Sequence, residues 1–195
     1  MSTQERRERE RARRHRLIVT VARELAEAEG WEAVTTRRLA ERIEYSQPVL
    51  YSHFAGKDAI VAAVALEGFA ELAAELGKAR ATAGTPREAL AALIHAYAGF
   101  ARLNPSLYDA MLTLAVDLPF GRPGTPAPLQ AAFAEFREAI AAFAAGRDTG
   151  ILAEVAWGSV HGLVTLTRSG RLPADHHERR LATLIDQLAA SAGRR

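Results

Sequence analysis

The chain has 195 residues, 49% of them hydrophobic, which is enough to bury a core in one or two domains. It has no cysteine, so disulfide bonds and cysteine-based metal sites are excluded. No apolar run approaches the roughly 18 residues of a membrane span, and the charged N-terminus lacks the apolar middle of a signal peptide. We therefore expect a cytoplasmic protein with no membrane partner.

Positive charge gathers at the N-terminal end. The formal net charge is +2, and the first 16 residues, MSTQERRERERARRHR, hold seven arginines against three glutamates. This distribution is typical of a protein that binds a polyanion. A solvated, partly disordered arm is the alternative, and the composition of the arm favours neither.

The first long helix is predicted from one apolar face. The chain as a whole reads as helix, because Ala, Leu, Glu and Arg dominate. In this segment the apolar face consists of Ile18, Val21, Ala22, Leu25 and Ala26. Gly30 is placed to end the helix, and Thr35 is a good N-cap for a short second helix, TRRLAERI.

A third short helix is predicted from Ser46, which is placed to cap it, with Pro48 tolerated in its first turn. Leu50 and Phe54 are four residues apart and are expected to face the core. A longer helix follows over about 57–80. Beyond it, breaks at 82–86, 104–105, 118–128, 146–150 and 169–175 separate four or five further helical segments. The Pro- and Gly-rich stretch 118–128 is a predicted loop, open to disorder or to a role as a ligand gate.

Two short helices joined by a tight turn, after a longer supporting helix, predict a helix-turn-helix. In that motif the N-terminal residues of the second short helix meet base edges in the major groove of DNA. Gln47 can bond bidentately to adenine, and Pro48 and Val49 can pack on thymine methyl groups. The side chains further along can donate to phosphates; they are Tyr51, Ser52 and His53.

Residues 18–66 resemble the DNA-binding domain of the TetR family of bacterial transcriptional repressors. The family pattern runs Gly–aromatic, Thr-Thr/Val-Arg, Ile/Leu-Ala, a turn, Leu-Tyr-x-His-Phe and a Lys, and this chain reads GWEAVTTRRLAERIEYSQPVLYSHFAGKDAI. The resemblance implies that Arg37 reads a guanine and that Thr36 and Lys57 join the phosphate-contacting residues. One position departs from the pattern, since Glu44 stands in the turn where the family usually has Gly. A left-handed backbone there costs a non-Gly residue about 1 kcal/mol.

Motif and resemblance together predict one DNA-binding set. Its members are Thr35, Thr36, Arg37, Ser46, Gln47, Pro48, Val49, Tyr51, Ser52, His53 and Lys57.

The C-terminal stretch EVAWGSVHGLVTLTRSGRL resembles a Trp-x-x-x-His-Gly signature found in some TetR relatives. The resemblance implies a homodimer in which the last two helices, over about 150–168 and 175–192, pair with their copies. Small residues four apart allow helices to approach closely, and an apolar stripe draws one face along the last helix. The predicted dimer interface is Gly158, Gly162, Leu181, Leu184, Ile185 and Leu188.

Aromatic and polar residues spread over the C-terminal part are mostly expected in the core, and some can line a ligand cavity. The predicted ligand-pocket residues are His95, Phe100, Tyr108, Met111, Phe133 and Trp157. No cofactor, metal or catalytic site is expected. In DHHE, at 175–178, Asp175 and Glu178 fit a helix-capping box better than a metal site. Ser159 and His161 lie two apart, on different helix faces, without a nucleophile elbow.

The sequence thus predicts an all-α protein in two parts. Residues 1–56 form a three-helix helix-turn-helix domain with a basic arm, and residues 57–195 form a helical domain for dimerisation and ligand binding. The expected partners are a double-stranded DNA operator, a second copy of the chain and a small-molecule effector. Family resemblance implies a repressor released from a palindromic operator by that effector. A DNA-binding architectural protein, or a regulator without an effector, is the alternative.

Overall fold

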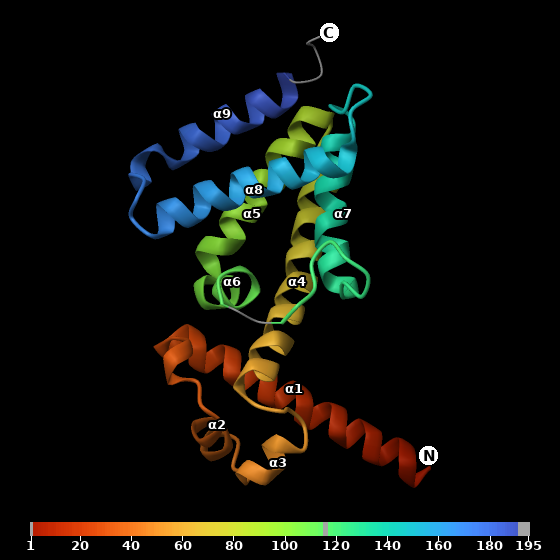
Figure 1. Ribbon diagram of the computed structural model, residues 1–195, viewed down its shortest axis with the longest axis vertical. Helices are drawn as coiled ribbons and strands as arrows, with labels where there is room; N and C mark the ends of the chain where they lie inside the picture. Colours follow the sequence, from red (N-terminus) through yellow and green to blue (C-terminus); the bar gives the residue numbers. More distant parts are fainter. Residues whose placement is uncertain (1, 115–116, 191–195) are drawn as a thin grey trace. The chain divides into compact units, whose positions relative to one another are not determined.

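The computed structural model describes residues 2–114 and 117–190, and within these ranges every regular element is helical. The elements of the first half, shown in Figure 1, are α1 (Thr3–Glu29), η1 (Trp31–Ala33), α2 (Thr36–Arg42), α3 (Gln47–Tyr51) and α4 (Lys57–Ala81). Those of the second half are α5 (Pro86–Leu103), α6 (Pro105–Leu112), α7 (Ala127–Ala141), α8 (Thr149–Arg168), η2 (Ala174–His176) and α9 (His177–Ala190). The all-α prediction is confirmed. None of the described helices combines the length and apolar character needed to span a bilayer.

The chain divides into two compact units. The first unit runs to Gly68 and includes Asn104–Gly121, and the second consists of Phe69–Leu103 and the chain from Arg122 onward. The boundary falls within α4, and α6 belongs to the first unit although it follows α5 in the sequence. The predicted division into 1–56 and 57–195 is a division by function, and it stays a prediction.

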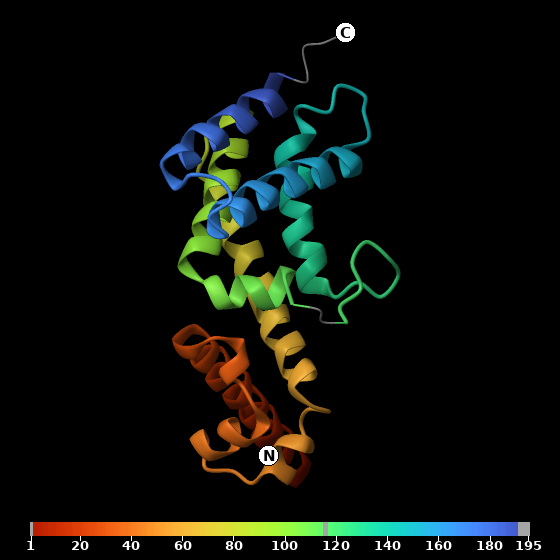
Figure 2. The same ribbon diagram turned by 60° about the vertical axis from the view of Figure 1, so that its left-hand side comes forward.

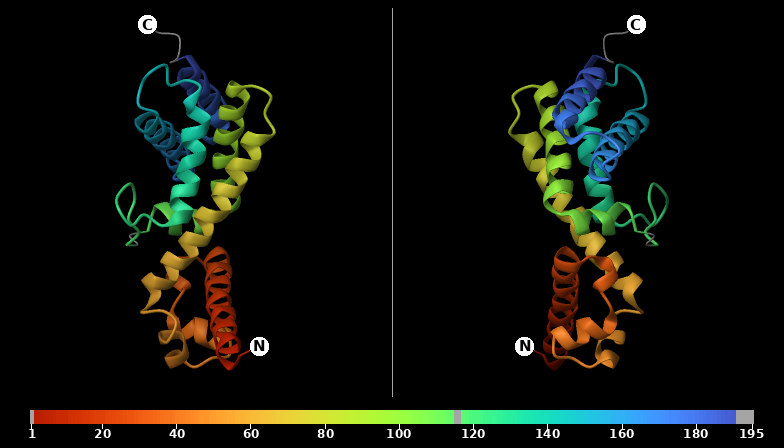
Figure 3. Two further views of the ribbon diagram at one scale, coloured as in Figure 1. Left: turned by 90° about the vertical axis from the view of Figure 1, so that its right-hand side faces the viewer. Right: turned by 90° about the vertical axis from the view of Figure 1, so that its left-hand side faces the viewer.

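In the first unit α1 contributes the core side chains against which the shorter helices α2, α3 and α6 pack. Its buried side chains are Ile18, Val19, Val21, Ala22, Leu25 and Ala26, which include the whole apolar face expected from the sequence. Figure 3 shows α2 and α3 lying beside α1. The basic arm is helical, because α1 begins at Thr3 behind a capping box. In that box the Ser2 hydroxyl accepts from the Glu5 N–H at 3.2 Å and the Glu5 carboxylate accepts from the Ser2 N–H at 2.8 Å.

Polar contacts tie α6 to the end of α1. The carboxylate of Glu27 accepts hydrogen bonds from the backbone N–H groups of Ser106 (3.2 Å) and Leu107 (2.9 Å), which are unpaired within the first turn of α6. The Ser106 hydroxyl donates to the Ala26 carbonyl at 2.9 Å, and the Trp31 indole N–H donates to the Ser106 carbonyl at 2.7 Å. These bonds make α6 part of the first unit.

The second unit is a helical bundle in which α7, α5 and α9 pack around α8. Figures 1 and 2 show α9 running back along α8. The described part of the predicted loop, from 117 to 126, contains no helix, and α7 begins at Ala127. Residues 115–116, and the end of the last predicted helix beyond 190, lie outside the described residues.

The predicted capping box at Asp175 is wrong. Asp175 lies inside the η2 turn, and α9 begins two residues later at His177. Glu178 instead faces His95, with 3.5 Å between a carboxylate oxygen and the ring Nδ1. The physical reason is that Pro173 leads into a 3₁₀ turn before the α-helix starts, which moves the helix start past Asp175. The described residues contain no cluster of three or more His, Asp or Glu side chains arranged to hold a metal.

Candidate nucleic-acid interface

The turn between α2 and α3 has a left-handed backbone at Glu44, although this residue is not glycine. Glu44 has φ 57°. The Tyr45 N–H donates to the Ala40 carbonyl at 2.9 Å, and the Glu44 N–H donates to the Glu41 carbonyl at 3.4 Å. This pair of bonds is the Schellman pattern that usually ends a helix with Gly. The chain therefore makes the family turn at the steric cost of about 1 kcal/mol.

Ser46 occupies the N-cap position of α3, but its hydroxyl makes no capping bond. Pro48 has no N–H to offer, and the Val49 N–H donates to the carbonyl of Ser46 at 3.0 Å instead. The predicted position is thus right and the predicted side-chain cap is wrong. Because Ser46 is exposed, its hydroxyl faces solvent at the start of α3.

One side of α3 is fixed in the core and the other is presented to solvent. Leu50 is fully buried and Phe54 nearly so, and the Phe54 ring lies 4.5 Å from the ring of His15. Gln47 and Pro48 are exposed, as expected for base-reading residues. A rigid helix that offers a polar amide at its outer N-terminal edge has the geometry of a base-reading element.

The predicted phosphate-contacting residues form a rim around this edge. The Thr36 and Tyr51 hydroxyl oxygens lie 3.5 Å apart, which brings the first turn of α2 next to the end of α3. Tyr51 is 55% exposed. The exposed Ser52 hydroxyl donates its one hydrogen to the Val49 carbonyl at 2.7 Å, so a phosphate would have to replace that carbonyl as its acceptor. The structure therefore brings Thr36 of α2 and Tyr51 of α3 together on one surface of the first unit.

The two adjacent arginines of α2 behave differently, which the sequence did not reveal. Arg38 forms a fork with both carboxylate oxygens of Glu29 at 2.9 Å, and this pair joins α2 to α1. The hydrogen bond from Arg38 is the main reason that the pKa of Glu29 is lowered. Arg37 is exposed, and among the described residues it pairs only with Glu41, four residues along the same helix, at 2.9 Å. Such a surface pair is weak, so Arg37 remains available to a base.

Lys57 and His53 are half-buried, whereas most other members of the predicted set are exposed. The Lys57 ammonium group donates to the Trp31 carbonyl at 2.6 Å. His53 is half-buried, and its Nδ1 has no hydrogen-bond partner among the described residues. The pKa of His53 is lowered by burial first, and then by the positive charges of Arg11, His15 and Arg14. This environment favours a neutral imidazole, which can still donate one hydrogen bond.

The predicted ligand-pocket residues do not gather around one described cavity. Tyr108 and Met111 are buried in the first unit. The other four belong to the second unit, where the Phe133 and Trp157 rings meet edge to face at 6.3 Å. His95 is exposed.

Sequence reasoning missed a polar cluster in the second unit. The Trp157 indole N–H donates to the Tyr97 hydroxyl at 3.1 Å, and that hydroxyl lies 3.4 Å from His161 Nδ1. Tyr97 is fully buried. Trp157 and His161 are four apart on α8, so their spacing was the signal that placed them on one face.

The predicted dimer residues divide into two groups. The apolar side chains of α9 are buried within the chain itself, which accounts for their spacing without a partner; they are Leu181, Leu184, Ile185 and Leu188. By contrast, a Cβ atom added at Gly158 or Gly162 would meet nothing within 4 Å. The two glycines thus face open space, and the dimer interface stays a prediction.

Two family models match the chain. The model described as "Bacterial regulatory proteins, tetR family" matches residues 18–64. The model described as "Tetracyclin repressor-like, C-terminal domain" matches residues 90–189, about half of the chain. The first match covers the helix-turn-helix described above. The second covers the helices of the second unit from α5 onward, together with α6.

Two curated relatives match part of the chain. An uncharacterized HTH-type transcriptional regulator, YobS of Bacillus subtilis, is 34% identical over 97 residues, which is 50% of this chain and 50% of YobS. The tetracycline repressor protein class C of Escherichia coli is 48% identical over 48 residues, 25% of this chain and 22% of the repressor. The matched region thus spans half or less of these relatives.

Solved structures match over nearly the whole chain. A protein of unknown function from Rhodococcus sp. RHA1 has a TM-score of 0.73 at 24% identity and is covered over 95% of its chain, with 92% of this one. FadR of Bacillus subtilis, solved in complex with stearoyl-CoA, has a TM-score of 0.69 at 15% identity, with 90% of this chain and 97% of FadR covered. At these identities the likeness shows a shared fold.

Proposed function

Because this chain belongs to the TetR family of bacterial regulatory proteins, which are helix-turn-helix transcriptional regulators and not enzymes, we propose that it is a ligand-controlled repressor. It binds a palindromic operator as a homodimer and leaves the operator when a small molecule binds. The DNA operator, the dimer and the effector are all parts of this proposal.

The observation that carries the proposal is the two-sided character of α3. Leu50 and Phe54 lock the helix into the first unit, while Gln47 and Pro48 are left exposed at its N-terminal edge. Core packing gives no reason for a polar amide there, and a major groove supplies one. Hydroxyl groups on the rim are suited to phosphates, which fix the position of the protein on DNA without reading sequence.

A homodimer is supported by an apolar stripe along α8. Ile151 is 56% exposed, Val155 53% and Leu166 40%, and the two open glycines continue the same helical face between them. Spacings of three and four residues place all five positions in one line. Exposed apolar residues in a line are typical of a surface that a partner covers. A second copy satisfies this surface and presents two recognition helices to successive major grooves, about 34–36 Å apart.

The effector is proposed to bind in the second unit. Buried Tyr97, with Trp157 and His161, places a few polar atoms in apolar surroundings, which is the usual make-up of a small-molecule site. FadR of Bacillus subtilis shows that this fold is compatible with stearoyl-CoA, and for this chain we propose an effector with an apolar portion. Such a ligand lowers DNA affinity only by its preference for the conformation that does not fit the operator.

The test begins with the full chain and a pool of random DNA duplexes. Repeated selection and sequencing should return an inverted repeat, whose two halves are read by the two copies of α3. Failure to enrich any sequence at moderate salt would overturn the proposal. If an operator emerges but no compound that stabilises the protein against heat weakens operator binding, the alternative of a DNA-binding protein without an effector is favoured.

A further inference from the structure

The N-terminal extension of α1, defined here as Thr3–Arg16, lies outside the matched family segment, which begins at residue 18. Its side chains are exposed or half-buried, and the first buried side chain of α1 is Ile18. The extension adds roughly 20 Å of helix. The His15 ring packs on Phe54 at the C-terminal end of the extension. Since isolated helices of this length are marginal in water and this one buries no apolar side chain, packing on the first unit accounts for little of it.

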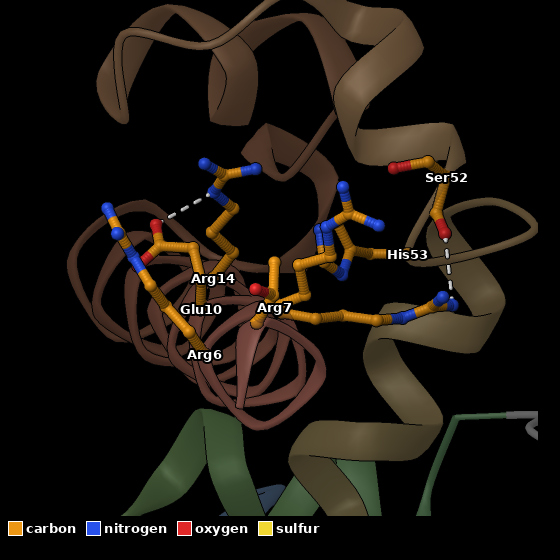
Figure 4. A pocket seen from close by; sticks show the side chains of 8 residues that line it. Arg6, Arg7, Glu10, Arg14, Ser52 and His53 are labelled. Atoms are coloured by element: carbon orange, nitrogen blue, oxygen red, sulfur yellow. Dashed lines mark hydrogen bonds and ion pairs between the residues drawn. The ribbon is translucent and has the colours of Figure 1, made fainter. Parts of the chain in front are cut away.

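One face of the extension forms a groove with the residues that follow α3 (Figure 4). This arginine groove has a volume of about 530 Å³ and is lined by Thr3, Arg6, Arg7, Glu10, Arg11, Arg14, Ser52 and His53. In Figure 4, Arg6, Arg7 and Arg14 come from α1, and Ser52 and His53 lie on the opposite wall. The Arg11 guanidinium donates a long hydrogen bond of 3.5 Å to the Ser52 carbonyl, and this bond joins the two walls of the groove.

Positive charge in the arginine groove is not balanced. Its one carboxylate, Glu10, is engaged by Arg13 and Arg14, each at 3.1 Å, and the hydrogen bond from Arg13 is the main cause that lowers the pKa of Glu10. Within the described residues Arg6 and Arg7 have no carboxylate partner. Four guanidinium groups beside one already paired carboxylate leave a site for an anion.

His53 supplies an independent observation on the opposite wall. Its Nδ1 is buried and has no partner among the described residues. A polar atom in that position normally has a hydrogen-bond partner. Because this nitrogen has no exposed surface, an anion seated between His53 and the arginines becomes its partner when the half-buried ring turns. The groove is also continuous with the proposed DNA-reading surface, because Ser52 and His53 directly follow α3.

We propose that the N-terminal extension binds the backbone phosphates of duplex DNA that flanks the half-site read by α3, with one phosphate held in the arginine groove by Arg7 and Arg11 beside His53. This inference rests on the proposed function, and it adds a second, sequence-independent contact surface. Guanidinium groups suit this role because their planar fork matches phosphate oxygens. The contact lengthens the footprint on DNA beyond the palindrome.

The experiment compares two double variants that remove the same charge from the same helix. Arg7→Gln/Arg11→Gln removes two positive charges from the arginine groove, while Arg9→Gln/Arg16→Gln removes two charges from residues that do not line it. Each is titrated with the selected operator, once as the bare palindrome and once with about ten base pairs added on each side, over a range of salt. Thermal unfolding verifies that both variants are folded, which their exposed positions favour.

We expect wild type and the Arg9/Arg16 variant to bind the flanked duplex more tightly than the bare palindrome. The Arg7/Arg11 variant should lose that gain. Its slope of log K against log salt should shrink by roughly 0.9 per protomer for the one phosphate contact that is lost, which is roughly 1.8 for the dimer. Between about 50 and 200 mM salt the change for the dimer corresponds to an affinity that falls about tenfold less than that of the wild type.

Two failures are distinguishable. Wild-type protein that selects and binds an operator, but shows no gain from the flanks or shows it equally in the Arg7/Arg11 variant, overturns this inference and leaves the proposed function standing. An equal loss of affinity in both double variants shows a diffuse charge effect and likewise overturns the proposal that the arginine groove holds a phosphate. Wild-type protein that binds no duplex overturns the proposed function and this inference with it.

Discussion

Lys57, the first residue of α4, donates a hydrogen bond of 2.6 Å from its ammonium group to the carbonyl oxygen of Trp31. Trp31 is buried, and its indole N–H donates in turn to the Ser106 carbonyl at 2.7 Å. Lys57 thus begins a chain of contacts that links the starts of α4 and α6 through η1. The family resemblance predicts that the same lysine contacts a DNA phosphate, so its ammonium group has two candidate partners.

Substitution of Lys57 separates these two roles. Lys57→Ala should weaken binding to all sequences alike and reduce the salt slope by about one unit. It should also lower the free energy of unfolding by about 1 kcal/mol, because the Trp31 carbonyl keeps the Val34 N–H but loses its charged donor. Lys57→Gln, which keeps a donor and removes the charge, is the control. A salt slope equal to that of the wild type, together with lower stability in urea, would assign Lys57 to the fold alone.

Gln47 is predicted to read a base. Gln47→Ala should cost about 1–3 kcal/mol on the selected operator and relax the preference at one base pair, because a bidentate contact to adenine is lost. Non-specific binding should hardly change. Tyr51→Phe is the comparison, since loss of a phosphate donor weakens all sequences equally. Competition binding on operators mutated at each position measures both, and a uniform loss for Gln47→Ala would contradict base reading.

The left-handed turn before α3 gives a stability prediction. Glu44→Gly should raise the free energy of unfolding by about 0.5–1 kcal/mol, because relief of the steric cost at φ 57° exceeds the extra freedom that Gly gains in the unfolded chain. Ala145, at φ 49° in the second unit, offers a matched control. Ala145→Gly should stabilise similarly and leave DNA binding unchanged. A lower urea midpoint for Glu44→Gly would show that its side chain contributes something the backbone argument omits.

The order of the helices and the identity of the DNA-reading motif could be predicted because both depend on local signals. The apolar spacing from Ile18 to Ala26 indicates a helix face, and Thr35 and Ser46 mark helix starts without reference to the rest of the chain. The effect of Glu44 on the turn could not be predicted from the sequence, and the structure shows that the Schellman hydrogen bonds are kept with Glu44 in the left-handed region.

Features that depend on contacts between distant residues could not be predicted. Nothing local distinguishes Arg37 from Arg38, yet only Arg38 lies opposite Glu29. The capping of α6 by Glu27 joins residues about 80 positions apart. For the same reason an apolar stripe such as that of Leu181 and Ile185 predicts a buried face but not what covers it, and here the chain's own helices do.

The half-buried histidine of α8, His161, predicts a pH dependence of stability. Burial first, and then the positive charge of Arg168, lower the pKa of His161. The unfolded chain, where histidine titrates near about 6.5, therefore binds a proton that the native protein resists. Stability contributed by neutral His161 is fully present above this pH and is lost as the pH falls toward the lowered pKa.

His161→Gln should accordingly flatten the loss of stability below about pH 6.5, as followed by urea unfolding at a series of pH values. The wild type should lose more stability than the variant on acidification. The pKa of His53 is also lowered and acts in the same direction, so part of the slope should survive in the variant. Parallel curves for wild type and variant would show that His161 is not held neutral.

The open glycines of α8 permit a test of the dimer that does not damage the monomer. A side chain at Gly162 starts in open space, since no atom lies within 4 Å of its Cβ position. Gly162→Trp should therefore leave the folded chain intact, while holding the paired α8 helices apart and exposing the stripe that includes Val155. Gly99→Trp is a matched control, because Gly99 is also a helical glycine with nothing near its Cβ position and lies on α5.

Light scattering and operator binding then measure the two halves of the prediction. Wild type and Gly99→Trp should be dimers at micromolar concentration. Gly162→Trp should be a folded monomer that unfolds in a cooperative transition. One recognition helix makes too few contacts for tight binding, so Gly162→Trp should lose the operator although Gln47 and the rest of α3 are unchanged. A wild-type monomer that still binds the palindrome tightly would remove the dimer, and with it the control of DNA binding through the distance between two recognition helices.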